Sequence, residues 1–420
     1  MSKTDVGFWQ VQEPVAWPQS PLWMSFSTLT ELEACQRRWA LMNAKYAGIW
    51  EHRGYPSPIV TPALDGIVVH RSLRRIVRAL AKKGCGSLVD VGAVSVLRQL
   101  GGYTGVVKES IEEVLVPYVS NPRVAHTLGR LRDSLEAKAP EIRLRTQRLL
   151  SRIRPGQLSL KATVPRYGAK PHPALGYGTY SEVPLQAPEL GWRGVADVVN
   201  LSATECEICD YKTGDPREDY KYQLLIYALL WARDSELNPS RRLVDRLALC
   251  FQGFDVEVPC PDARGLDLLE AELRERSNLA LSGLGSGMPP AQTSPQNCTV
   301  CHVRHLCEDY WLWIARQRTA GDPVEGHFAD LQTRLSSQHG PTSWDGEVES
   351  CATVSARRPV LLRTNDTWLF LHEDQHLRVL NAFVQTQDDD VRQGYPLAVA
   401  SIGSYSEVFV LPERIASKAG

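Results

Sequence analysis

The chain has 420 residues, of which 43% are hydrophobic and 23% are charged, and its formal net charge is -1. This composition predicts an ordered protein of two or three domains and excludes a disordered or fibrous chain. The near-zero charge argues against a uniformly basic nucleic-acid coat, so any DNA binding has to use local basic patches.

Membrane and secretion signals are absent from the sequence pattern. No apolar run approaches the roughly 18 residues that cross a bilayer, and residues 1–19 carry neither a basic leader nor an apolar signal core. We therefore expect a cytoplasmic protein that has no membrane partner. In a reducing compartment, the ten cysteines are expected to be ligands or buried small side chains instead of disulfides.

The N-terminal region is expected to be an extended arm over residues 1–24, followed by a helix that Ser27 or Thr28 caps and that contains Cys35. An amphipathic helix is expected over residues 64–80, with His70 on it beside several arginines. A histidine in this setting is either structural, or it coordinates a metal or approaches a phosphate.

Residues 94–154 keep a helical pattern, and residues 123–154 are the most basic stretch of the chain. Such a stretch is either a solvated face or a helical insertion that follows a phosphate backbone. The candidate DNA contacts on the two basic segments are Arg71, Arg74, Arg75, Arg143 and Arg145.

Strands are expected over residues 158–164 and 180–185, the second with Glu182 as a possible further acidic group. Residues 194–201 and 205–214 are short apolar or β-branched runs that a three-residue turn separates, which predicts an antiparallel hairpin.

The hairpin carries the strongest candidates for chemistry. Asp197 lies on its first strand, and Asp210 and Lys212 lie two residues apart on its second. Because side chains alternate between the faces of a strand, Asp210 and Lys212 are expected to project to the same side. Two carboxylates beside a lysine suit a hard divalent cation and an attacking water, although the same residues also occur on solvated faces.

The helix expected over residues 219–231 is apolar on almost every side, and Gln223 and Tyr227 share one face of it. A buried amide needs hydrogen-bond partners, so Gln223 either makes a tertiary hydrogen bond or helps to hold phosphate or lysine at the hairpin. A further hairpin over residues 246–258 and a helix over residues 262–281 follow.

Cys298, Cys301 and Cys307 form a C-x2-C-x5-C run, which is a strong ligand signal. Zinc could use these three cysteines with His302 or His305. A c-type haem fits the C-x-x-C-H start of the run, but its attachment takes place outside the cytoplasm. A 4Fe-4S cluster needs a fourth thiolate. Another pair, Cys206 and Cys209, is expected to point to opposite faces of a strand and not to share a metal.

The C-terminal part is expected to be a linker over residues 318–345 and a small all-β domain over residues 346–420. Short alternating strands and turn residues predict a small barrel, OB-like or similar. Its aromatic residues either fill the barrel or stack on single-stranded bases; they are Trp368, Phe370, Phe383 and Phe409.

Taken in this order, the features resemble the PD-(D/E)xK nuclease superfamily, most of all the branch that holds the RecB and AddB nuclease domains and the CRISPR-associated adaptation exonucleases. The matching features are the helix with Cys35, Gly66-x3-His70, Gly194-x2-Asp197, Asp210-Tyr211-Lys212-Thr213-Gly214, Gln223-x3-Tyr227 and the terminal cysteine run.

The resemblance implies an α/β fold, with a restriction-endonuclease-like core of a mixed sheet flanked by helices over residues 25–317. It implies a divalent metal (Mg²⁺ or Mn²⁺) at His70, Asp197 and Asp210, with Lys212 as the catalytic lysine and with Gln223 and Tyr227 as supporting residues. It also implies a 4Fe-4S cluster whose ligands are Cys35, Cys298, Cys301 and Cys307.

The expected function is therefore metal-dependent hydrolysis of DNA, single-stranded or frayed at its ends, in repair or antiphage defence. The sequence lacks the G-x4-G-K-[ST] motif of helicases, so an unwinding engine would be a separate ATPase or a defence-complex subunit. The alternative is a non-catalytic DNA-binding or scaffold subunit that keeps the nuclease fold.

Overall fold

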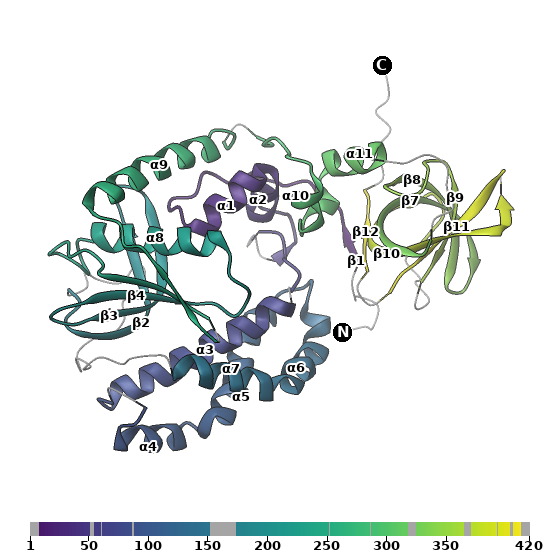
Figure 1. Ribbon diagram of the computed structural model, residues 1–420. Coiled ribbons are helices and arrows are strands. Elements are labelled where there is room, and N and C mark those ends of the chain that lie inside the picture. Colours follow the sequence, from purple (N-terminus) through teal and green to yellow (C-terminus); the bar gives the residue numbers. More distant parts are fainter. Residues whose placement is uncertain are drawn as a thin grey trace. The chain divides into compact units, whose positions relative to one another are not determined.

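The computed structural model describes residues 8–50, 54–59, 61–85, 88–151, 174–251, 253–285, 287–317, 325–364, 371–392, 394–403 and 406–412 (Figure 1). The chain divides into two compact units, each built from separate segments. Residues 20–33 and 59–282 form the first, which we call the sheet unit; residues 1–19, 34–58 and 283–420 form the second, which we call the barrel unit.

The sheet unit is organised around a mixed sheet with the strand order β2-β3-β4-β5-β6. Only β4 and β5 are parallel; the other neighbours are antiparallel. The β3–β4 hairpin is the one expected from the sequence. The strands are β2 (Gly178–Ala187), β3 (Trp192–Leu201), β4 (Cys206–Tyr211), β5 (Arg246–Cys250) and β6 (Asp255–Val258).

One face of this sheet is covered by α8 (Glu218–Arg233), which contacts β2, β3, β4 and β5 (Figure 1). Because α8 lies between the sheet and α9 (Ala263–Leu281), it is buried along most of its length, as its all-round apolar sequence predicts. The buried Trp192 on β3 donates its indole N–H to Ser277 Oγ of α9 at 3.1 Å, which ties the layers together. Helix α1 (Phe26–Ala34) belongs largely to this unit.

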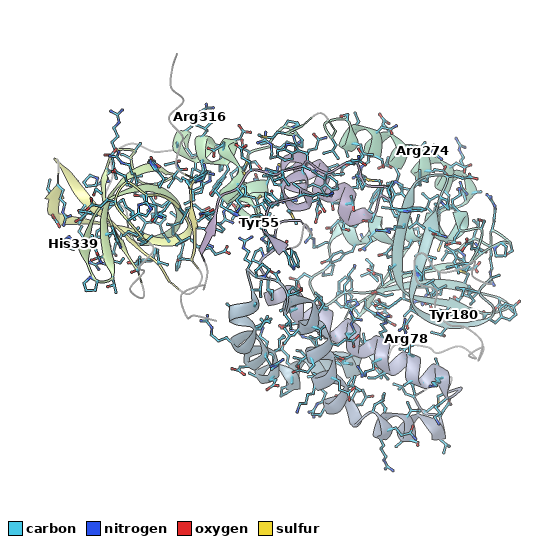
Figure 2. All side chains as sticks on the ribbon, turned by 180° about the vertical axis from the view of Figure 1, so that it is seen from behind. Tyr55, Arg78, Tyr180, Arg274, Arg316 and His339 are labelled. Atoms are coloured by element: carbon cyan, nitrogen blue, oxygen red, sulfur yellow. The ribbon has the colours of Figure 1, made fainter. Side chains whose placement is uncertain are left out.

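The other face packs against a helical layer that starts with α3 (Thr61–Lys82). Val198, Cys209 and Tyr211 of the sheet join the apolar side chains of these helices in one buried core. Figure 2 labels Arg78 on α3 and Tyr180 on β2, whose hydroxyl donates to Gly176 O at 2.9 Å. The layer continues with α4 (Val91–Gln99), α5 (Gly102–Leu115), η2 (Val116–Tyr118), η3 (Ala125–Thr127), α6 (Leu128–Ala137) and α7 (Ala139–Leu150).

The barrel unit contains a sheet in which β7, β8, β9, β11 and β10 are neighbours in that order and β10 pairs again with β7. This closure, with β9 and β11 parallel, makes a five-stranded barrel of the expected OB-like kind. The strands are β7 (His327–Gly340), β8 (Ser343–Cys351), β9 (Pro359–Arg363), β10 (His376–Arg392) and β11 (Tyr395–Ser401).

Strand β12 (Glu407–Val410) extends the sheet beside β10, and β1 (Phe8–Gln10) pairs with β12 in parallel. The unit also holds the cysteine segments, because Leu380 and Phe409 of the barrel share a buried cluster with Cys298, Cys301 and Cys307. Its helices are α2 (Gln36–Asn43), α10 (Pro295–Thr299), η4 (Arg304–Leu306) and α11 (Glu308–Arg316).

The expected fold class is confirmed: a mixed sheet flanked by helices, a helical insertion and a small β-rich C-terminal region. The expected domain boundaries stay predictions, but two segments differ in detail. Strand β7 occupies much of the expected linker 318–345, and β1 lies within the expected arm 1–24; both strands form by pairing with strands distant in sequence, which no local pattern predicts. The expected strand 158–164, Trp368 and Phe370 lie outside the described residues.

We predict that Asp234→Ala lowers the free energy of unfolding by about 2–4 kcal/mol, since it leaves buried donors without an acceptor. Asp234 follows α8 and is 1% exposed; its carboxylate accepts from the backbone N–H groups of Gln186, Glu236 and Leu237 at 3.0, 3.1 and 2.9 Å. Urea denaturation measures the loss. Asp133→Ala, at an exposed position of α6, is the control and should change stability little. An equal loss in both variants would contradict the prediction.

Candidate functional site

The candidate active site lies where β3 and β4 part. The last paired residues are Val198 of β3 and Cys209 of β4. Asp197 and Asp210 are the next residues at the open end of the hairpin. At the fork, Asp197 Oδ2 accepts the backbone N–H of Tyr211 at 2.7 Å, so a side chain takes the place of a strand partner. Both carboxylates are therefore held side by side at the open end of the hairpin.

Lys212 connects the hairpin to α8. Its Nζ lies 2.5 Å from Asp210 Oδ2 and donates to Gln223 Oε1 at 2.9 Å. The amide nitrogen of Gln223 in turn donates to the hydroxyl of Tyr227 at 2.8 Å. The structure thus brings together Asp210, Lys212, Gln223 and Tyr227 in one chain of contacts.

His70 reaches the fork from α3, and its Nδ1 lies 3.4 Å from Asp197 Oδ2. Two glycines explain the close approach of these elements. A Cβ on Gly66 would lie 3.0 Å from Thr213 Oγ1, and a Cβ on Gly194 would lie 2.8 Å from Tyr227 Cε1. Larger residues at these positions would push α3 or Tyr227 away from the hairpin.

Burial and mutual charge set the protonation of the fork. Burial, together with the charge of Asp197, raises the pKa of Asp210 to about 7, against the lowering effect of Lys212. Burial also opposes the ionised form of Asp197, but His70 and the Tyr211 N–H outweigh it and lower the Asp197 pKa. For His70, burial acts to lower the pKa, and the Asp197 carboxylate reverses this so that the pKa is raised.

The chemical types of the donors at the fork suit a divalent cation, but their present arrangement does not form a metal site. An imidazole and two carboxylates are ordinary ligands of Mn²⁺ and Mg²⁺, and the buried Asp210 Oδ2 forms no hydrogen bond in its present surroundings beyond its ion pair with Lys212. Within the described residues, no group of three or more His, Cys, Asp or Glu side chains is arranged so that it could hold a metal ion. Lys212 and His70 now balance the negative charges of these carboxylates, so a metal would have to replace those two contacts.

Glu182 lies beside the fork in a small cavity that His70, Arg74, Asp197 and Tyr211 also line. It has a left-handed backbone (φ 55°) within β2, and its carboxylate pairs with Arg74 at 3.4 Å. A non-glycine residue in this conformation is strained. The sequence suggested the acidic group but gave no signal of the backbone conformation.

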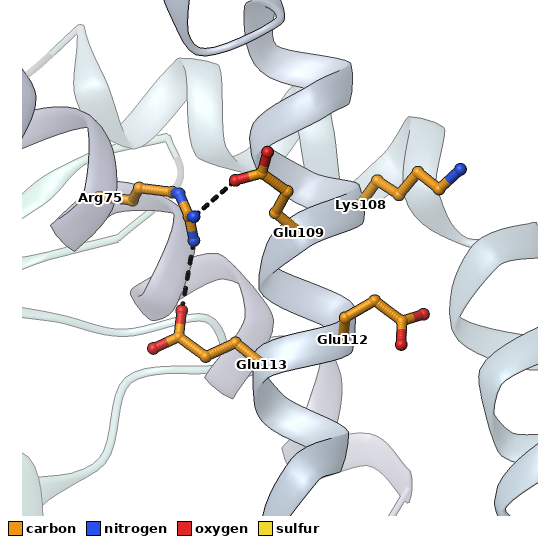
Figure 3. Close-up of a pocket in the computed structure, with 5 residues that line it drawn as sticks. All are labelled: Arg75, Lys108, Glu109, Glu112 and Glu113. Atoms are coloured by element: carbon orange, nitrogen blue, oxygen red, sulfur yellow. Dashed lines mark hydrogen bonds and ion pairs between the residues drawn. The ribbon is translucent and has the colours of Figure 1, made fainter.

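The arginines that were expected to contact DNA differ in their surroundings. Arg75 pairs with Glu109 at 2.5 Å and with Glu113 (Figure 3). Arg71 also pairs with Glu113. Arg145 pairs with Glu141 on its own helix, whereas Arg143 is exposed. Nothing in these contacts tests DNA binding, so the five arginines stay predictions.

The four expected cluster cysteines line one cavity of the barrel unit, together with Arg37, Arg38 and Arg304. The expectation that Cys35 sits within a helix is wrong: α1 ends at Ala34, α2 begins at Gln36, and Cys35 between them has an extended backbone. This break turns its thiol toward the cavity, where Cys35 Sγ accepts the backbone N–H of Gln292 at 3.5 Å.

The other three sulfurs have a similar environment. Burial raises the pKa of Cys301 to about 12 and that of Cys307 to about 11, while the backbone groups of Val303 and Tyr310 act in the opposite direction. Burial also raises the pKa of Cys298, and a hydrogen bond with the backbone of Ser294 acts to lower it. Backbone N–H groups near sulfur favour the thiolate, the form that ligates iron or zinc.

Neither histidine of the cysteine segment lines this cavity. His305 is fully buried and stacks on Phe409, with ring centroids 3.7 Å apart. The position of His305 therefore matches a packing role. Among the residues that line the cavity, the four cysteines supply the soft ligand atoms.

Comparison with known families agrees with the fold. Residues 23–308 match the model of the PD-(D/E)XK nuclease superfamily, and the chain belongs to that superfamily. Members of the superfamily are metal-dependent nucleases that use divalent ions such as Mg²⁺ and Mn²⁺. No curated protein sequence gave a significant match. None of the described helices combines the length and apolar character of a membrane span.

We predict that the affinity of the DNA-free protein for Mn²⁺ rises with pH through about 7, the pKa of Asp210. Below that pH a proton occupies the carboxyl, and His70, whose pKa is also raised, must lose its proton to act as a ligand. Isothermal titration calorimetry in buffers of different ionisation enthalpy measures both the affinity and the proton release.

Asp210→Asn is the matched variant for this titration, because it keeps the size of the side chain and removes the titrating carboxyl. It should bind Mn²⁺ more weakly and release fewer protons. An affinity of the unaltered protein that stays constant across this pH range would contradict the prediction.

Proposed function

We propose that this protein is a Mg²⁺- or Mn²⁺-dependent deoxyribonuclease that acts as an exonuclease on single-stranded or frayed DNA. The contact of Lys212 with both Asp210 and Gln223 carries the proposal, because it fixes an ammonium at the carboxylates where a phosphate would be attacked. The preference for single-stranded ends rests on the resemblance to exonucleases of the same superfamily.

In this proposal His70, Asp197 and Asp210 hold the metal. When bound, the metal would lower the pKa of a water molecule and neutralise charge on the scissile phosphate. The residues of the chain do the positioning: Gln223 keeps the ammonium of Lys212 in place, and Tyr227 fixes the orientation of the Gln223 amide. Lys212 can then donate to the attacking water or to a phosphate oxygen.

We predict that Lys212→Ala and Asp210→Ala abolish cleavage while the protein stays folded. The reason is that each removes a group at the reacting centre, and such losses typically cost about 10²-fold or more. The measurement is cleavage of end-labelled single-stranded, double-stranded and frayed DNA with Mg²⁺, Mn²⁺ or chelator, with circular dichroism as the folding check.

Lys221→Ala provides the control, since this lysine is on α8 and pairs with Glu218. It should retain the activity of the unaltered protein. Metal-dependent cleavage by Lys212→Ala at the unaltered rate would remove the assignment of Lys212 as the catalytic lysine, and no cleavage by the unaltered protein under any metal condition would contradict the enzymatic proposal.

The second candidate is a non-catalytic DNA-binding or scaffold subunit of a helicase–nuclease or defence complex. The pairing of Arg71 and Arg75 with glutamates, together with a barrel that a minimal nuclease does not need, favours a partner role. DNA binding without cleavage under any metal condition would support it. A separate helicase or ATPase is the proposed partner in either case.

We also propose that Cys35, Cys298, Cys301 and Cys307 ligate a 4Fe-4S cluster. Their common cavity, the backbone N–H groups directed at the sulfurs, and the neighbouring arginines suit a group that carries net negative charge. Zinc is the alternative metal, and the all-sulfur lining fits it as well.

We predict that the anaerobically purified protein is brown, with a broad absorbance at about 400 nm and iron and sulfide in equal amounts. Cys298→Ser should lose most of the iron, because one ligand is missing. Cys351→Ser, in the barrel wall and outside the cavity lining, should keep it. Stoichiometric zinc without iron would overturn the cluster.

A further inference from the structure

The face of α8 that carries Gln223 and Tyr227 extends one turn further toward the start of the helix. Tyr220 lies three residues before Gln223 and seven before Tyr227, so the three side chains form one stripe. The Nζ of Lys212 lies 4.5 Å from the centroid of the Tyr220 ring. Neither the hairpin pattern nor the family pattern includes Tyr220.

The ammonium of Lys212 therefore has three neighbours. It forms an ion pair with Asp210 Oδ2 and donates to Gln223 Oε1, and the face of the Tyr220 ring covers a third side. An ammonium has three N–H donors, and an aromatic face attracts a cation without supplying a lone pair. Only 15% of the Lys212 side chain is exposed, which agrees with an ammonium that is contacted on these three sides.

The ring is itself held in place. Tyr220 is half-buried, its hydroxyl would be 3.8 Å from a Cβ on Gly214, and the guanidinium of Arg217 lies 5.5 Å from the ring centroid. Arg217 is in turn fixed by Asp219 at 2.7 Å. The turn between β4 and α8 thus lies beside the ring that Lys212 contacts.

We infer that Tyr220 is a positioning residue for Lys212 in the nuclease reaction. If Asp210 served as a metal ligand, its carboxylate would be less available to Lys212, and the ammonium could donate to water or phosphate instead. The ring would keep the ammonium at the fork in that state, because an aromatic face attracts a cation electrostatically without using a carboxylate or amide oxygen. The inference rests on the proposed function of Lys212.

Substitution of the ring tests this role. Tyr220→Leu should lower the single-turnover cleavage rate by roughly 3- to 30-fold, which corresponds to the usual strength of a cation–π contact. Its affinity for DNA, measured with Ca²⁺ in place of Mg²⁺, should not change. Tyr220→Phe keeps the ring and should restore the rate. Equal losses in Tyr220→Leu and Tyr220→Phe, or no loss in either, would overturn the inference.

Tyr222→Leu is the matched control, because Tyr222 lies on the same helix but contacts Phe26, Glu272 and Arg276. It should leave the cleavage rate unchanged where its melting temperature shows that it is folded. A rate loss as large as that of Tyr220→Leu would show a general effect of perturbing α8 and would contradict the positioning role.

A spectroscopic measurement separates this inference from the proposed function. In metal-free protein with ¹³C-labelled lysine, the ε-methylene of Lys212 should show an upfield ring-current shift that Tyr220→Phe keeps and Tyr220→Leu removes. Absence of that shift in the unaltered protein would refute the contact even if cleavage occurs. If the shift is present but no cleavage occurs, the proposed function fails and the positioning role in catalysis fails with it.

Discussion

The candidate site depends on a single hydrogen bond that separates two strands. By accepting the Tyr211 N–H, the carboxylate of Asp197 replaces the backbone partner that β4 would otherwise have. The ladder therefore stops at Val198 and Cys209, and Asp210 is left beside Asp197 instead of being paired across a closed sheet. Lys212, His70 from α3 and the face of α8 that carries Gln223 are placed around this opening, and Gly66 and Gly194 allow their close approach. One polar side chain thus fixes both the local geometry and the electrostatics of the fork.

The charges at the fork are balanced within the protein. Two buried carboxylates so close together would be costly without partners, and Lys212 and His70 supply them. The same contacts keep the groups oriented before any metal arrives. The cysteine cavity shows a related arrangement, since the buried thiols are accompanied by backbone N–H groups and by Arg37, Arg38 and Arg304. In both places the chain prepares the surroundings of a charged group from its own polar atoms.

Much of this arrangement was predictable from residue patterns, because strand alternation and helix spacing place side chains on faces. The hairpin, the common face of Gln223 and Tyr227, and the presence of a small C-terminal barrel follow from such periodicities, whereas β7, which closes the barrel, lies in a segment that was expected to be a linker. The helix break at Cys35, the left-handed backbone of Glu182 and the pairing of β1 with β12 do not. Each depends on contacts with residues that are distant in the sequence, so no local pattern predicts it. Tyr220 was not predictable for a different reason. A tyrosine in the first turn of a helix is common, and only its contact with Lys212 indicates a role at the site.

The division of the chain has a consequence for biosynthesis. The sheet unit is nearly continuous in sequence, whereas the barrel unit joins residues 34–58 to residues beyond 282. A ribosome therefore releases a complete sheet unit while Cys35 and the apolar residues around it still await their partners. Closing so long a loop is entropically costly and slow, so the cysteine cavity should be among the last parts to form. Until that cavity forms, the thiol of Cys35 lacks the burial that it has in the folded protein.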